Sequence, residues 1–291
     1  MADSRRYGQV SFKASHNSYD RDELPITDQL TWSAQHPHQA GCRGLEVDIV
    51  EAPNLWLWSV QHGGGDQGTA DVQLAEYLRH LRHWSEFHPN HDVITITVDL
   101  KSESKDSRQF PRYFDLVVNE CLGAERLYTP RQLLGSHSNL VAAAMSDGWP
   151  TLSELRGKFI LCLSGEDEAT KRGYARGRRR LCFVDQRFRS RDAYPSTTVG
   201  DRVFFNFDTS GSWAWDRRLR WFATQQGLIT RAYVLNEENL WNKVRAAEAN
   251  ILATDKVRNQ SWAKIGSQPF RKHRSALRPS QTPPPSAPAS T

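Results

Sequence analysis

Apolar residues along the first 267 positions form short strand-like runs that alternate with longer amphipathic segments. Within 71–87, Leu74, Leu78 and Leu81 recur at helical spacing, whereas 92–100 is rich in β-branched residues and favours a strand. The same criteria predict elements along the rest of this region. Strands are expected at 9–14, 44–50, 55–61, 92–100, 159–163, 181–184, 203–207, 228–234 and 251–253, and helices at 71–87, 108–122, 213–226 and 237–249.

This alternation of strands and helices indicates the α/β class. Repeated βα units favour a parallel sheet covered by helices, and a count of about eight strands suits a closed (β/α)8 TIM-type barrel better than an open sheet. No glycine-rich nucleotide fingerprint follows the first strand, which weakens the case for an open dinucleotide-binding fold. We therefore expect residues 1–267 to form a single barrel domain.

The segment 268–291 differs in composition from the rest of the chain. It holds six of the fourteen prolines and four basic residues without an acid, so we expect a Pro- and Ser-rich, basic, disordered tail. The whole chain has 291 residues and a net charge of +5, of which the tail supplies four charges and the barrel region only one. That balance does not support a nucleic-acid partner. No apolar run approaches the roughly 20 residues of a membrane-spanning helix.

Acidic side chains interrupt two of the predicted apolar strands. Glu46 and Asp48 lie two positions apart in the second strand, so both side chains face the same side. Asp99 follows the apolar run 94–98 in the same way. An unpaired buried carboxylate is costly, and these acids therefore indicate a bound metal or another cation. In a barrel the active site lies at the C-terminal strand ends, which here also supply His16, Asn17, His62 and Lys101.

These residue types favour metal-assisted phosphodiester chemistry. Carboxylate and amide oxygens suit Ca²⁺ or, less readily, Mg²⁺, whereas zinc prefers imidazole or thiolate ligands. Two histidines beside a hard cation are typical of a general base paired with a general acid, while the metal polarises a phosphoryl oxygen. The predicted metal ligands are Asn17, Glu46, Asp48 and Asp99, and the predicted acid–base pair is His16 and His62.

Four motifs resemble the X region of phosphatidylinositol-specific phospholipase C, in particular its Ca²⁺-dependent bacterial-type branch. They are Ser-His-Asn-Ser at 15–18, Gly-Cys-Arg-Gly-Leu-Glu-Val-Asp at 41–48, Gln-His-Gly at 61–63 and Trp-Pro-Thr-Leu-Ser-Glu-Leu-Arg-Gly-Lys at 149–158. The segments 229–232 and 253–255 are similar more loosely, and the resemblance spans residues 8–258. It implies a distorted (β/α) barrel that cleaves the glycerol–phosphate bond of phosphatidylinositol-type lipids, giving diacylglycerol and a cyclic or linear inositol phosphate.

The resemblance also implies roles for individual residues. His16 matches the general base that deprotonates the inositol 2-hydroxyl, and His62 matches the general acid that protonates the leaving group. Asp99 stands where a glutamate is more usual among the Ca²⁺ ligands. The strand at 159–164 lacks the lysines that hold ring phosphates in eukaryotic relatives, which argues against polyphosphorylated inositides. We expect substrate contacts from Lys101, Arg43, Arg231 and Asp255.

Two alternatives come from other classes of protein. Glycerophosphodiester phosphodiesterases and sphingomyelinase D-type enzymes share the barrel superfamily, two histidines and a Glu-x-Asp pair, but they lack the Ser-His-Asn-Ser start. The second alternative is a non-catalytic binding or scaffold barrel. The presence of both His16 and His62 counts against it, because a site released from catalysis has no reason to retain them.

A substrate anchored in a bilayer requires an enzyme that touches the membrane, so we expect peripheral membrane contact. We also expect the protein to be a monomer. No apolar signal-peptide core follows the N-terminus, and the four cysteines show no metal-site spacing, so we expect a cytoplasmic or peripheral-membrane location, with non-classical secretion as the other route. The tryptophans could instead belong to the core, and the basic run at 171–180 could be a solvated loop. The candidates for membrane contact are Trp56, Trp58, Trp213, Trp215 and the basic run.

Overall fold

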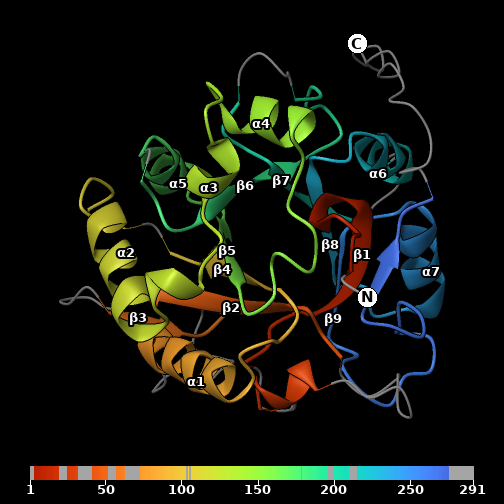
Figure 1. Cartoon of the computed structure of the whole chain (residues 1–291), viewed down its shortest axis with the longest axis horizontal. Coiled ribbons are helices and arrows are strands. Elements are labelled where there is room, and N and C mark those ends of the chain that lie inside the picture. Colours follow the sequence, from red (N-terminus) through yellow and green to blue (C-terminus); the bar gives the residue numbers. More distant parts are fainter. Residues whose placement is uncertain are drawn as a thin grey trace.

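A computed structural model describes residues 3–19, 25–31, 41–51, 57–62, 73–102, 104, 106–177, 179–195, 200–209 and 215–274. Eight parallel strands close into a ring in the order β1-β9-β8-β7-β6-β5-β4-β2, and β2 pairs with β1 (Figure 1). The predicted (β/α)8 barrel is therefore confirmed. The strands of the ring are β1 (Val10–Ser15), β2 (Gly44–Glu51), β4 (Ile94–Leu100), β5 (Phe159–Gly165), β6 (Phe183–Phe188), β7 (Phe204–Asp208), β8 (Ile229–Tyr233) and β9 (Ile251–Thr254).

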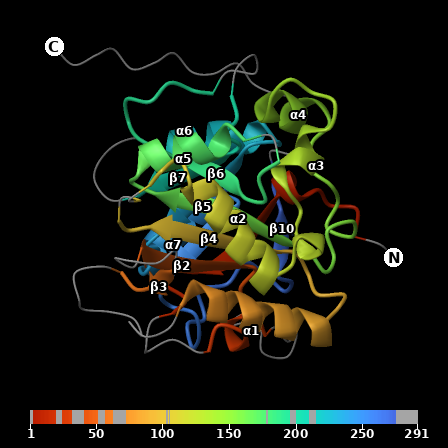
Figure 2. The same cartoon turned by 90° about the vertical axis from the view of Figure 1, so that its left-hand side faces the viewer.

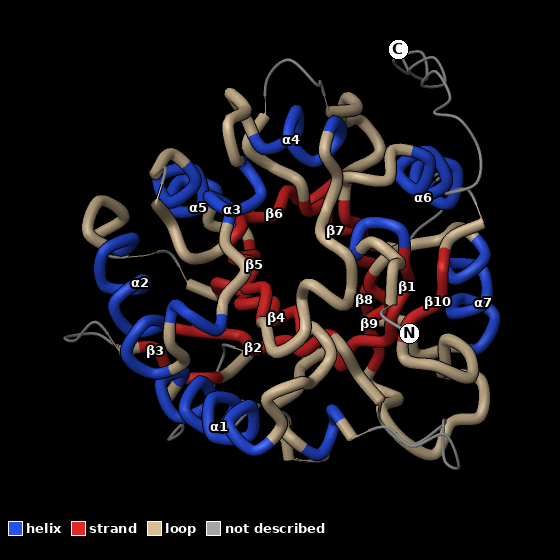
Figure 3. Tube along the Cα trace, in the orientation of Figure 1, coloured by secondary structure: helices blue, strands red, loops and turns tan. Residues whose placement is uncertain are grey.

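Helices surround the ring of strands, as the tube in Figure 3 shows. Within the described residues, the outer helices are α1 (Leu74–Phe87), α2 (Phe110–Cys121), α5 (Glu168–Ala175), α6 (Trp215–Thr224) and α7 (Glu238–Ala246). Two short helices, α3 (Pro130–Leu134) and α4 (Leu140–Ser146), lie toward the same end of the barrel as the N-terminus (Figure 2). The sequence predicted α1, α2, α6 and α7 but not α3, α4 or α5, which are 5, 7 and 8 residues long and so too short to show a helical period.

The ring closes through a narrow seam between β1 and β2. Only Ala14 and Gly44 pair across it, whereas β2 and β4 share six pairs. A side chain at Gly44 would bring its Cβ within 2.6 Å of the Ala14 Cβ, so the close approach of the two strands requires glycine. The barrel is consequently distorted at this point, as the family resemblance implies.

One predicted barrel strand lies outside the ring. The segment predicted at 55–61 contains β3 (Trp58–Val60), which pairs antiparallel with the far end of β2. Because β3 is antiparallel and at the sheet edge, it adds a hairpin and not a barrel strand, and its assignment to the barrel was wrong. The hairpin still turns the chain back along β2, so that the Gln61 N–H bonds the Asp48 carbonyl at 3.0 Å and His62 follows beside Asp48.

The chain remains ordered beyond the boundary predicted at residue 267. Strand β10 (Phe270–Lys272) pairs antiparallel with β1, and the following His273 is fully buried against Ser11. The start of the predicted tail therefore packs on the barrel, and its disorder was wrongly predicted for 268–274. Residues 275–291 of that segment lie outside the described residues.

An aromatic cluster fills the end of the barrel opposite the C-terminal strand ends. Trp149, from the motif at 149–158, is fully buried against Tyr7, Phe183 and Phe204, and its indole N–H donates to the Gly227 carbonyl at 2.8 Å. The aromatic cluster gives the motif at 149–158 a structural role, because it fills one end of the barrel. The opposite end, where the strands have their C-termini, is left for the active site.

Most of the candidates for membrane contact have other roles. Trp58 packs edge-on against Phe110, and Trp215 is equally buried, so both belong to the core. The basic run begins inside α5 with Lys171, which is fully buried, so the run is not a solvated loop throughout. Trp56, Trp213 and Arg178 lie outside the described residues. Among the helices of the described ranges, none combines the length and apolar character that crossing a bilayer demands.

Candidate active site

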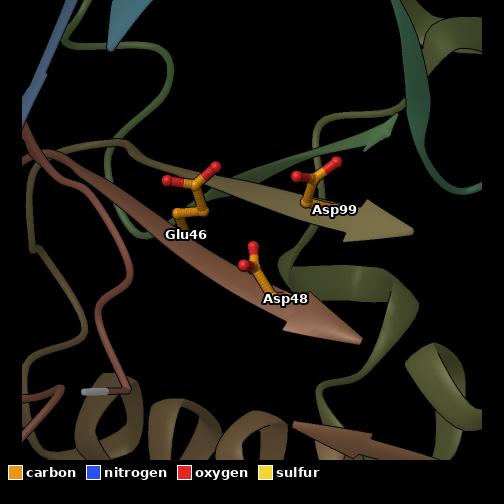
Figure 4. A group of neighbouring side chains, drawn as sticks. All are labelled: Glu46, Asp48 and Asp99. Atoms are coloured by element: carbon orange, nitrogen blue, oxygen red, sulfur yellow. The ribbon is translucent and has the colours of Figure 1, made fainter. Parts of the chain in front are cut away.

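Three carboxylates meet inside the barrel at the C-terminal ends of β2 and β4. Glu46 and Asp48 project from the same face of β2, and Asp99 on β4 pairs directly with Asp48 in the sheet register. One oxygen from each group lies within 4.8 Å of the others (Figure 4). The period of two along β2 and the parallel register together produce this acidic cluster, as the sequence predicted.

The acidic cluster is buried and incompletely paired. Asp48 is fully shielded from solvent, and burial together with the charges of Glu46 and Asp99 raises the pKa of its carboxyl to about 7. Burial also raises the pKa of Asp99. The Oδ1 atoms of Asp48 and Asp99 have no hydrogen-bond partner among the described residues. Unpaired buried oxygens and three converging carboxylates fit a hard divalent cation such as Ca²⁺ or Mg²⁺.

Two basic side chains balance part of this negative charge. The Lys101 ammonium lies 3.1 Å from Asp48 Oδ2 and 2.7 Å from Asp99 Oδ2. The Arg231 guanidinium lies 2.5 Å from Glu46 Oε2. Burial of Glu46 opposes its ionisation, but Arg231 and nearby cations outweigh burial and lower the pKa of that carboxyl. Lys101 and Arg231, two of the four predicted substrate contacts, thus lie at the site, where each is paired with an acid.

His16 follows β1 and faces the acidic cluster. Its Nδ1 lies 2.6 Å from Asp255 Oδ1, its Nε2 lies 3.8 Å from Glu46 Oε2, and its ring stacks on Tyr233. Burial disfavours the imidazolium, but the bond to Asp255 and the charge of Glu46 outweigh it and raise the pKa of His16. Asp255, predicted as a substrate contact, is the hydrogen-bond partner of His16 Nδ1.

Asn236 holds Asp255 in turn. Its side-chain amide donates to the second carboxylate oxygen of Asp255, and its carbonyl oxygen accepts from the Asp255 backbone at 2.9 Å. No spacing in the sequence could have identified Asn236, because it lies 19 positions from Asp255 and 220 from His16 in the chain. The loop after β8 alone brings it there.

His62 approaches the acidic cluster from the β3 hairpin. Its Nε2 lies 4.0 Å from Asp48 Oδ2, and about half of its side chain is exposed. The two predicted acid–base residues therefore lie beside the same cluster, His16 next to Glu46 and His62 next to Asp48. The glycines at 63–65, predicted as a tight loop for substrate approach, lie outside the described residues.

Asn17 adopts a left-handed backbone conformation with φ of 48°. Asparagine tolerates this region better than most residues, because its short polar side chain can bond locally. The turn brings the Asn17 backbone N–H within 3.3 Å of Glu46 Oε2. The fourth predicted metal ligand thus lies beside Glu46.

A polar chain across the barrel interior was missed from the sequence. Arg231 donates to Asn206 Oδ1 at 3.1 Å, and the Asn206 amide lies 3.4 Å from Ser164 Oγ. Ser164 donates to Asp185 at 2.6 Å, and Asp185 pairs with the buried Lys171 at 3.0 Å. Asn206 interrupts the aromatic strand Phe204–Asp208, which is the same signal that identified Glu46 and Asp48. This series of polar contacts holds the Arg231 side chain in place.

A cavity of about 390 Å³ opens beside the acidic cluster. Its lining includes His16, Lys101, Arg231, Tyr233, Glu166 and Arg187. A polar cavity at the C-terminal strand ends is where a barrel enzyme binds its substrate.

Arg43 lies at the other end of the barrel. It precedes β2, its Nε donates to Asp92 at 2.9 Å, and its Nη1 donates to the carbonyls of Leu30 and Cys42. The predicted substrate contact from Arg43 is therefore wrong, because the residue precedes the strand whose opposite end holds Asp48.

The family model for Ca²⁺-dependent phosphoinositide phospholipase C matches residues 50–195, half of the chain. The chain belongs to the Ca²⁺-dependent phosphoinositide phospholipase C family. Membership confirms the resemblance to this phospholipase family and places the protein among phosphodiesterases. The match contains His62, Asp99 and Lys101 but begins after His16, Glu46 and Asp48, whose assignment rests on the geometry above.

Solved structures share the phospholipase fold. A calcium-dependent phosphoinositol-specific phospholipase C from a Gram-negative Pseudomonas species, in an apo form with myoinositol, aligns with a TM-score of 0.75 at 20% identity, over 93% of this chain and 96% of that one. A Ca²⁺-dependent phosphatidylinositol-specific phospholipase C from Streptomyces antibioticus aligns with a TM-score of 0.67 at 21% identity, over 86% and 95%. No curated protein matches the sequence.

Proposed function

We propose that this phospholipase cleaves the glycerol–phosphate bond of phosphatidylinositol-type lipids, releasing diacylglycerol and an inositol phosphate. The observation that carries the proposal is the position of two imidazoles beside one carboxylate cluster, at 3.8 Å from Glu46 and 4.0 Å from Asp48. A base and an acid on opposite sides of a phosphoryl group can deprotonate the attacking hydroxyl and protonate the leaving oxygen.

His16 is the proposed general base. The hydrogen bond from Nδ1 to Asp255 keeps a proton on Nδ1 and leaves Nε2 as the acceptor that faces the cavity. Nε2 would accept the proton of the inositol 2-hydroxyl as that oxygen attacks phosphorus. Asp255 and the stacked Tyr233 hold the ring in this orientation.

His62 is the proposed general acid. Its exposed position on the β3 hairpin suits a group that donates to the glycerol oxygen of a lipid entering from outside. The residues that would hold a divalent cation are Asn17, Glu46, Asp48 and Asp99. When bound there, the cation would offset negative charge that develops on the phosphoryl oxygens.

The cavity supports a head group without additional ring phosphates. Arg187, the basic residue on β6 that lines it, is paired with Glu166 and with Asp208 at 3.3 Å. A cation engaged by two carboxylates offers little net charge to a phosphate. Phosphatidylinositol itself is therefore the proposed substrate. We also propose that the enzyme acts as a monomer at the membrane surface, on the cytoplasmic side or, after non-classical secretion, outside the cell.

Turnover of phosphatidylinositol by histidine variants tests the proposal. His16→Ala and His62→Ala should each lower kcat by about 10²- to 10⁴-fold, the usual contribution of a general acid or base. His80→Ala, an exposed histidine on α1, should leave kcat unchanged. Circular dichroism shows whether each variant is folded. A folded His16→Ala enzyme with near-normal turnover would refute the mechanism, and turnover of water-soluble glycerophosphodiesters alone would favour the glycerophosphodiesterase alternative.

A further inference from the structure

The Lys101 ammonium lies between two of the carboxylates that would bind a divalent cation. It is 3.1 Å from Asp48 Oδ2 and 2.7 Å from Asp99 Oδ2. The backbone of Lys101 is held beside β2, because its N–H donates to the Ile49 carbonyl at 3.0 Å, next to Asp48. The ammonium forms ion pairs with both acids and therefore acts as a counter-ion within the cluster.

Lys101 and a metal ion cannot both be well bound by these acids. A calcium ion lies about 2.3–2.6 Å from each ligand oxygen, so an ion held by Asp48 and Asp99 would be only a few ångströms from the ammonium. At such a separation, in a site where Asp48 is fully buried, like charges repel strongly. Binding of the ion therefore requires the ammonium to move away.

The charge of the cluster favours such an exchange. With Glu46, Asp48 and Asp99 ionised, the carboxylates carry three negative charges, and Lys101 and Arg231 supply two positive ones. One negative charge is then left over. Departure of Lys101 leaves two negative charges, which a divalent cation neutralises and a monovalent cation does not.

Of the two basic residues, Lys101 is the one that can leave. Arg231 is held from outside the cluster by Asn206 at 3.1 Å and by the face of Tyr233 at 5.1 Å. Among the described residues, the Lys101 side chain forms ion pairs with Asp48 and Asp99 alone. It also lines the open cavity. Its flexible stem allows the ammonium to swing into that cavity.

We propose that Lys101 is an intramolecular counter-ion which a divalent cation must displace, so that Lys101 sets the cation affinity of the active site. The proposal rests on the metal site in the proposed function. It gives Lys101 a role different from substrate binding: the residue stabilises the metal-free enzyme and raises the Ca²⁺ concentration at which the site fills.

Calorimetric titration of the metal-stripped full chain with CaCl₂ tests the proposal. Lys101→Met should bind Ca²⁺ about 10- to 100-fold more tightly than wild type, because two charge-assisted contacts no longer compete. Lys243→Met removes the same charge from an exposed residue of α7 and should leave the affinity unchanged. Lys101→Gln, whose amide can still bond one carboxylate, should lie between wild type and Lys101→Met.

Thermal unfolding provides a second measurement that does not depend on turnover. In chelator, Lys101→Met should melt below wild type, because its carboxylates then lack a counter-ion, and Ca²⁺ should raise its Tm more than that of wild type. Equal or weaker Ca²⁺ binding by folded Lys101→Met and Lys101→Gln would overturn the proposal while leaving the metal site intact. Absence of Ca²⁺ binding in wild type and all variants would overturn both this proposal and the metal site of the proposed function.

Discussion

Replacement of Asp255 by asparagine should slow the enzyme without weakening substrate binding. The Asp255 carboxylate accepts from His16 Nδ1 at 2.6 Å, a short charge-assisted hydrogen bond that fixes the tautomer and orientation of the ring. Asparagine keeps the shape of the side chain but not its charge, and its amide can turn a donor toward Nδ1. His16 would then present the wrong nitrogen to the substrate for part of the time.

The magnitude follows from that one contact. A hydrogen bond to a charged group contributes about 1.5–3 kcal/mol, and each 1.4 kcal/mol in the barrier corresponds to tenfold in rate. Because 40% of the Asp255 side chain is exposed, solvent screens part of its charge. We expect Asp255→Asn to lower kcat by about 10- to 100-fold. This loss is smaller than the loss expected for His16→Ala.

Steady-state kinetics on phosphatidylinositol in mixed micelles measure the effect. Asp255→Asn should change kcat and leave KM within about twofold, since an interaction used only in the transition state affects kcat. Asp255→Glu should recover part of the rate, and Asp147→Asn, at an exposed position after α4, should match wild type. Unchanged kcat in folded Asp255→Asn would refute the role of Asp255 as the partner that orients His16.

Three further predictions concern stability. Gly44→Ala should destabilise the barrel by about 1–3 kcal/mol in urea denaturation, because the added methyl group would overlap Ala14 at the seam; an unchanged midpoint would show that the seam can relax. Val234 is a β-branched residue with φ of 57°, so Val234→Asn should relieve about 1 kcal/mol of strain and raise Tm by about 2–4 °C; a lower Tm would contradict this. Burial lowers the pKa of His273 to about 4, so the folded state keeps this group neutral, and its stabilising contribution is complete above pH 6.5 and is lost as the pH falls toward 4. Between pH 7.5 and pH 5, wild type should therefore lose about 2 kcal/mol more than His273→Gln, and equal losses would show that His273 is not kept neutral.

The acidic cluster could be predicted from sequence because local rules determine it. Glu46 and Asp48 share a face through the period of a strand, and Asp99 interrupts a second apolar strand in the same way. The parallel register then pairs Asp99 with Asp48. Each of these facts is local or depends on neighbouring strands, so the pattern alone was sufficient.

Other parts of the site depend on contacts between distant segments. Asp255 and His16 are 239 positions apart and meet only because β9 pairs with β1. Sequence spacing could place both near the C-terminal strand ends, but it could not tell a partner of His16 from a substrate contact. The same is true of Lys171, which lies in a basic run that is typical of a solvated loop. Its buried ion pair with Asp185 on the next strand could not be predicted from that run.

Errors in the fold arose where two arrangements share one pattern. The apolar residues of 55–61 fit a barrel strand or a hairpin equally well, and only the pairing of β3 with β2 decides between them. At the C-terminus, the composition of 268–291 as a whole masked three residues that extend the sheet at β1. Composition averages over a window and cannot detect so short a strand.

Phosphorus NMR of the reaction with phosphatidylinositol tests the central proposal most directly, because it identifies the bond that is broken and the need for a cation together. With Ca²⁺ present, the phosphodiester signal of the lipid should give way to that of a water-soluble inositol phosphate, and excess chelator should stop the reaction until Ca²⁺ is restored. Conversion at the same rate in excess chelator, or phosphorus retained in the lipid product, would contradict Ca²⁺-dependent cleavage of the glycerol–phosphate bond.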